Sequence, residues 1–68
     1  MKDLAEKFGQ NLRTARKAKE LSQNDLALQA NIDLSYVGRV ERGEANVTLD
    51  KVYQFAEALG CSAHDLLP

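Results

Sequence analysis

The segment from Ser22 to Gly43 constrains the fold most, because it carries two closely spaced sets of signals that start and end helices. Ser22 is followed three residues later by Asp25, the spacing of a capping box in which each side chain bonds the other residue's backbone N–H. Asn31 tolerates the left-handed conformation that ends a helix sharply, and Asp33 is a second N-cap residue. The segment therefore predicts two short helices joined by a tight turn, with Gly43 ending the second helix.

An amphipathic helix is predicted before this segment, and two more helices are predicted after it. Asp3 and Glu6 have capping-box spacing at the start of the first helix, which runs to about Lys19. Thr48 is placed to cap the fourth helix, and a short last helix follows over residues 63–67. The connecting signals are Leu21 as the anchor of the first turn, a loop over residues 43–47, Gly60 at the end of the fourth helix and Ser62 as the last N-cap.

Apolar side chains recur at helical spacing in these segments, and no segment has the pattern of a strand. We therefore expect residues 1–68 to form one all-α domain, a compact bundle of five helices. Leu66 and Leu67 are expected to fold back on its core or to meet a partner chain. The expected core residues are Leu4, Phe8, Leu12, Ala15, Leu26, Ala27, Ala30, Ile32, Val37, Val40, Leu49, Val52, Phe55, Ala56 and Leu59.

Length and composition narrow the class of protein. A chain of 68 residues has a marginal core unless it is helical and well packed or reinforced by association, which favours a homodimer. No apolar run reaches the roughly 20 residues of a membrane span, and no signal peptide precedes the first amphipathic pattern, so no membrane partner is predicted. Cys61 is the only cysteine, which excludes an internal disulfide and favours a reducing, cytoplasmic location.

Most of the chain also carries an ordered series of short motifs. The series is Leu21-Ser22-Gln23, Leu26-Ala27, Ile32, Asp33-Leu34-Ser35-Tyr36-Val37, Val40-Glu41-Arg42-Gly43, Asn46-Val47-Thr48-Leu49, Phe55-Ala56 and Leu59-Gly60. It resembles the Cro/cI-type (XRE-like) helix-turn-helix family of bacterial and phage transcription regulators, and most of all its small stand-alone members such as restriction-modification controller proteins. The resemblance implies a lambda-repressor-like domain whose second and third helices form the helix-turn-helix, with the third helix in the major groove of double-stranded DNA.

The outward face of the third helix would then approach the base edges. Arg39 is the main candidate for a base contact, since a guanidinium can bind O6 and N7 of guanine; the alternative is a solvated surface arginine. Tyr36 is expected either to contact DNA or to pack against the second helix. Leu34 is expected either to meet a thymine methyl or to be a singly exposed leucine. The other exposed candidates are Ser35 and Arg42.

Phosphate contacts are expected at the start of the second helix. Free backbone N–H groups and the helix dipole favour an anion there, and the resemblance implies that Gln23 binds a phosphate while bracing the third helix. The alternative for Gln23 is an ordinary exposed residue of a first turn. By resemblance, the further phosphate binders are Ser22, Asn24 and, in the loop after the third helix, Asn46.

Two residues of the third helix need a structural explanation. Glu41 is acidic on a helix that approaches DNA, and the resemblance implies an ion pair with Arg16 of the first helix, which fixes the angle of the third; Arg16 is also a candidate for a phosphate contact. Gly38 costs about 1 kcal/mol relative to alanine inside a helix. Close approach to DNA or crowding against the second helix would offset that cost. Because Val37 and Val40 define the buried stripe, we predict Gly38 on the surface side.

Catalysis is not predicted for this chain. Cys61 and His64 supply two ligands where a closed zinc site needs four, and no glycine-rich phosphate loop is present. No enzyme activity, cofactor, metal or small-molecule ligand is therefore expected. The main alternative to a DNA-binding regulator is a protein-interaction module that keeps the same helical fold and uses its surface to hold another protein, as an antitoxin holds its toxin.

Charge bears on that choice, because DNA-binding domains are usually basic and this chain has a net charge of −1. Residues 1–42 hold eight Lys and Arg against six Asp and Glu, whereas residues 43–68 hold one against four. The basic half includes the helix-turn-helix, which favours DNA. The prediction is a sequence-specific regulator that binds a near-palindromic operator as a homodimer, with half-sites about 34 Å apart. Candidate residues of the dimer surface, around the fourth and fifth helices, are Tyr53, Leu66 and Leu67.

Overall fold

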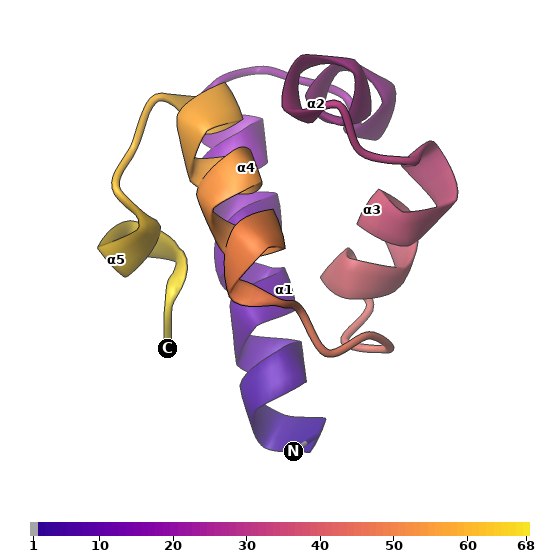
Figure 1. Ribbon diagram of the computed structural model, residues 1–68, viewed down its shortest axis with the longest axis vertical. Helices are drawn as coiled ribbons and strands as arrows, with labels where there is room; N and C mark the ends of the chain where they lie inside the picture. The colour runs from indigo at the N-terminus through magenta and orange to yellow at the C-terminus, as the bar shows by residue number, and fades with distance from the viewer. Residues whose placement is uncertain (1) are drawn as a thin grey trace.

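The computed structural model describes residues 2–68. This range contains helices joined by turns and loops, and it contains no strand. Figure 1 shows α1 and α4 side by side at the centre, α2 and α3 on one side of them, and α5 on the other. None of these helices is long and apolar enough to cross a membrane. The helices are α1 (Lys2–Ala18), α2 (Gln23–Ala30), α3 (Leu34–Glu41), α4 (Leu49–Leu59) and α5 (Ala63–Leu66).

The predicted caps of the helix-turn-helix are confirmed. The Ser22 hydroxyl accepts a hydrogen bond from the Asp25 backbone N–H at 2.9 Å, and the Asp25 carboxylate accepts one from the Ser22 N–H at 3.0 Å. Asn31 ends α2 in the left-handed conformation, with φ of 58°. The Asp33 carboxylate then accepts the Ser35 N–H at the start of α3. Short local signals therefore fix both ends of the turn between α2 and α3.

The core lies where α1 and α4 meet the other three helices. The rings of Phe8 and Phe55 pack with centroids 6.4 Å apart, and Val37 and Val40 of α3 are fully buried, as predicted. Leu66 is also fully buried, and the Asn11 amide of α1 donates to its carbonyl oxygen at 3.0 Å. The C-terminal helix is thus part of the core, which makes Leu66 wrong as a candidate for a dimer surface.

Three expectations for the helix ends are wrong. α1 already includes Lys2, so Asp3 lies inside its first turn, where its charge favours the helix dipole, and does not cap the helix. Leu49 is 73% exposed because it is the first residue of α4 and lies beyond the core, and Leu4 at the start of α1 is half exposed. Exposed leucines at helix starts are therefore available for contacts outside this chain.

The end of α3 is a Schellman motif built on Gly43. Gly43 has φ of 76°, its N–H donates to the Val40 carbonyl at 3.0 Å, and the Glu44 N–H donates to the Arg39 carbonyl at 2.9 Å. A side chain at Gly43 would meet Glu6, because a Cβ there lies 2.6 Å from Glu6 Cγ. Both the backbone conformation and the space therefore require glycine at this position.

The capping box of α2 predicts an acid-sensitive contribution to stability. Hydrogen bonds from Ser22, the backbone N–H first, hold the pKa of Asp25 below its usual 3.8. A carboxyl whose pKa is lowered in the folded state stabilises the fold above its unfolded pKa, and this stabilisation is lost as pH falls through the folded value. Asp25→Asn should lower the melting temperature by a few degrees at neutral pH and much less at about pH 3. Equal melting temperatures of variant and wild type at neutral pH would contradict this role.

Candidate nucleic-acid interface

The outward face of α3 is open along its length. Arg39 and Ser35 are exposed, and Leu34 at the start of the helix is 45% exposed. The opposite face carries Val37 and Val40, which have no exposed surface. The core therefore presents the sequence-predicted reading face of α3 to the outside of the molecule.

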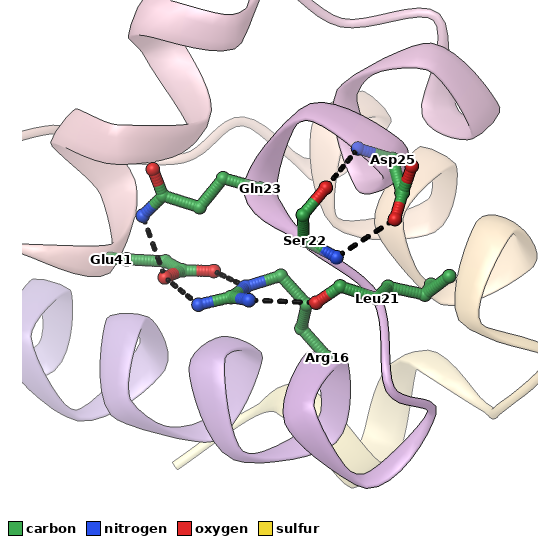
Figure 2. A network of polar contacts seen from close by, with 6 residues as sticks. All are labelled: Arg16, Leu21, Ser22, Gln23, Asp25 and Glu41. Atoms are coloured by element: carbon green, nitrogen blue, oxygen red, sulfur yellow. Dashed lines mark hydrogen bonds and ion pairs between the residues drawn. The ribbon is translucent and has the colours of Figure 1, made fainter.

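A buried ion pair holds the inner side of α3. Arg16 Nε donates to Glu41 Oε2 at 2.8 Å and Arg16 Nη2 donates to Glu41 Oε1 at 3.1 Å; the two side chains are 10% and 3% exposed. Arg16 Nη1 also donates to the Leu21 carbonyl at 2.8 Å, and Gln23 Nε2 donates to Glu41 Oε1 at 3.0 Å (Figure 2). We call these four residues the brace; it joins α1, the following turn, the start of α2 and the end of α3.

The brace removes an electrostatic conflict at the candidate interface. Glu41 is a negatively charged residue of α3, the helix whose exposed face is the candidate interface. Its carboxylate, however, accepts three hydrogen bonds and is almost completely buried. A buried ion pair is stable only when its remaining donors and acceptors are also satisfied. Arg16 directs its guanidinium to two partners inside the protein, so the structure supports a bracing role for it.

Gly38 is buried, and its predicted place on the surface side is wrong. The reason is that the Arg42 side chain folds back by one turn and covers it. A Cβ at Gly38 would lie 3.1 Å from Arg42 Nη1 and 3.8 Å from Gln23 Oε1. The tight contact is with Arg42 at the end of α3 itself, whereas Gln23 of α2 lies at an ordinary van der Waals distance. The Arg42 side chain, and not crowding against α2, therefore occupies the space beside the glycine in mid-helix.

Tyr36 and Ser35 both make side-chain contacts with other residues of this chain. Tyr36 is half-buried against the core, and Lys51 Nζ of α4 lies 5.9 Å from the centre of its ring. The Ser35 hydroxyl donates to the Asp33 carboxylate, which lowers the pKa of Asp33 and keeps it ionised at neutral pH. Leu34, in the same first turn of α3, is 45% exposed.

The predicted phosphate-binding residues come from two segments. Ser22, Gln23 and Asn24 form the start of α2, where Ser22 and Asn24 are exposed and Gln23 is half-buried by its contact with Glu41. Asn46 is exposed in the loop after α3. Backbone N–H groups at the start of α2 add partial positive charge, which suits an anion at this end of the helix.

Glu44 is a charged neighbour of this surface that sequence reasoning missed, as is Lys51 beside Tyr36. Arg42 Nε and Nη2 donate to the two oxygens of Glu44 at 3.1 and 3.2 Å, and both side chains are more than half exposed. The spacing Arg-x-Glu across Gly43 is a signal for this pair, because a glycine in the left-handed conformation turns the chain back on the helix end. Among residues 2–68, no three His, Cys, Asp or Glu side chains lie together as metal ligands would.

The profile of the helix-turn-helix family matches residues 12–66. The chain belongs to this XRE-like family of DNA-binding transcription regulators. It is similar to the control protein C.BamHI of Bacillus amyloliquefaciens, with 39% identity over 61 residues that cover 88% of this chain and 75% of that protein. It is also similar to the control protein C.SmaI of Serratia marcescens, with 40% identity over 65 residues covering 96% and 77%.

A solved structure agrees with these sequence relatives. The restriction-modification controller protein C.AhdI from Aeromonas hydrophila superposes with a TM-score of 0.90 at 48% identity, covering 93% of this chain and 96% of that one. The similarity spans nearly all of both chains, so the predicted fold class and family are confirmed.

The brace predicts a large difference between two glutamates that each pair with an arginine. Glu41→Ala leaves Arg16 buried without its partner and should cost roughly 3–5 kcal/mol of unfolding free energy. Glu44→Ala breaks an exposed pair and should leave the unfolding free energy nearly unchanged. Urea unfolding followed by circular dichroism measures both; Glu41→Gln replaces Glu41→Ala if the alanine variant does not fold. Equal losses for the two positions would show that the brace has no special role.

Proposed function

We propose that the chain is a sequence-specific DNA-binding regulator that places α3 in the major groove. The observation that carries this proposal is the open face of α3, which is held from behind by the brace and by fully buried valines. A helix that reads bases must keep its angle to the groove. The hydrogen bonds of the brace have defined directions, whereas apolar packing is non-directional. Membership of a family of transcription regulators supports the same function.

Specific and non-specific contacts divide between the two helices of the motif. Arg39 is the proposed reader of a guanine, with Ser35, Tyr36, Leu34 and Arg42 around it on α3. The start of α2 and Asn46 are the proposed phosphate contacts, which fix the position of α3 on the duplex. Since the net charge of the chain is −1, non-specific attraction to DNA is weak and base contacts carry more of the binding.

We further propose a homodimer that binds a near-palindromic operator. Tyr53 is 65% exposed on α4, and a groove of about 610 Å³ runs beside it between α4 and α5, with Gln54, Ala56 and Cys61 in its lining. Leu67, the residue after α5, is 45% exposed. A second copy at this surface would bury Tyr53, Leu67 and the apolar part of the groove, whose lining also includes Asp50 and Glu57. Two α3 helices about 34 Å apart would then match successive major grooves.

Fluorescence anisotropy with the duplex that the wild-type protein selects from random DNA, here called the selected duplex, tests the main proposal. A preference for this duplex over a scrambled one that persists at higher salt supports a sequence-specific regulator. If the wild type selects no sequence from random DNA and binds none at low salt, a protein-interaction module such as an antitoxin is favoured instead, in which the same surface holds another protein.

Arg39→Ala tests the proposed base contact. Loss of a bidentate contact to guanine should weaken binding to the selected duplex by about 1–3 kcal/mol, with a much smaller loss on the scrambled duplex. Arg13→Ala is the matched control, since it removes the same charge from an exposed position of α1. If Arg39→Ala weakened binding to both duplexes equally, Arg39 would contact only the DNA backbone.

Tyr53→Lys tests the proposed dimer surface. The substitution removes the aromatic ring from the proposed interface and adds an ammonium there, so the dimer dissociation constant should rise at least about tenfold in sedimentation experiments. Gln10→Lys adds the same charge on the exposed side of α1 and should leave dimerisation unchanged. A wild-type protein that sediments as a monomer at all concentrations would contradict the proposed assembly.

A further inference from the structure

The Arg42 side chain lies in the space that a side chain at Gly38 would occupy. Its guanidinium folds back along the helix, and Nη1 lies 3.1 Å from where a Cβ of Gly38 would be. The carbonyl oxygen of the Gln23 side chain lies 3.8 Å from that same point. Arg42 is therefore positioned where α3 meets the start of α2, beside the proposed phosphate contacts.

The backbone of Glu44, the residue that pairs with Arg42, is fixed by the end of α3. The Schellman motif at Gly43 ties the Glu44 N–H to the Arg39 carbonyl, so Glu44 follows α3 in a set direction. Both of its oxygens accept hydrogen bonds from Nε and Nη2 of Arg42. The hydrogen bond from Arg42, with a smaller effect of its charge and that of Arg39, lowers the pKa of Glu44, which is therefore ionised at neutral pH.

The pairing of Arg42 with Glu44 affects contacts with DNA phosphates and contacts with base edges differently. A phosphate that approaches Arg42 also meets the negative charge of Glu44, so the attraction is largely cancelled. A base edge has acceptor atoms but no net charge, so it meets less repulsion from Glu44 than a phosphate does. Nη1 of Arg42 makes no hydrogen bond to Glu44. Glu44 therefore lowers the affinity of Arg42 for phosphates more than its affinity for base edges.

We propose that Glu44 is a specificity-determining residue: by pairing with Arg42 beside the reading helix, it weakens binding to DNA of any sequence more than binding to the selected duplex. This inference rests on the proposed function, because it needs a preferred sequence to exist. It makes the acidic residue of the turn a part of the interface, and Gly38 the positioning residue that admits the Arg42 side chain.

The test compares Glu44→Gln, Arg42→Gln and the double variant with the wild type on selected and scrambled duplexes over a range of salt. Glu44→Gln frees Arg42 to bind a phosphate. The affinity of this variant protein for the scrambled duplex should therefore be roughly fivefold higher than that of the wild type near physiological salt. The slope of log affinity against log salt should steepen by about one. Affinity for the selected duplex should rise less, so the preference falls. In the Arg42→Gln background, Glu44→Gln should have a much smaller effect, which separates the pair from a general change in charge.

Two failures are distinguishable in this experiment. If the wild type selects no sequence from random DNA, the proposed function is wrong. If it selects one, but Glu44→Gln leaves the ratio of the two affinities unchanged or acts equally with and without Arg42, the role of Glu44 is wrong. Circular dichroism melting of each variant establishes that the proteins compared are folded.

Discussion

The buried ion pair between Arg16 and Glu41 is the interaction on which the rest of the structure depends. Two charges removed from water destabilise a fold unless every donor and acceptor is satisfied, and here Leu21 and Gln23 complete the set. No buried side-chain nitrogen or oxygen among the described residues lacks a hydrogen-bond partner. Apolar burial is non-directional, whereas these hydrogen bonds have defined directions. The pair therefore fixes how α3 is oriented on the core, and the orientation of α3 decides what its outer face can reach.

Charge is distributed so that a slightly acidic chain keeps a usable DNA surface. The negative charge of Glu41 is withdrawn into the brace, and that of Glu44 is paired with Arg42 at the end of α3. Arg39 is left on the open face of the same helix. In this account the two glutamates have different purposes: the buried one holds the helix, and the exposed one limits binding to phosphates. The proposed arrangement would give a low non-specific affinity for DNA, as the net charge of −1 also predicts.

The sequence predicted those features that depend on a few neighbouring residues. The capping box of Ser22 and Asp25 and the buried stripe of α3 are properties of local spacing, and both are confirmed. Gly38 was misplaced because its burial depends on the direction that Arg42 takes one turn later. The pairing of Arg42 with Glu44 went unpredicted for a similar reason, since it depends on the chain reversal after α3. The DNA contacts remain predictions, because they are properties of a complex and not of the chain alone.

The central claim is that the outer face of α3 and the start of α2 form the DNA surface of a rigid domain. Titration of isotope-labelled protein with the selected duplex, followed by NMR of the backbone amides, tests it most directly. The account predicts shifts concentrated at residues 22–24, 34–39 and 43–47, with the amides of the α1 core face nearly unmoved. Shifts confined to α4 and α5, or loss of the amide signals of α3 through unfolding on binding, would contradict it.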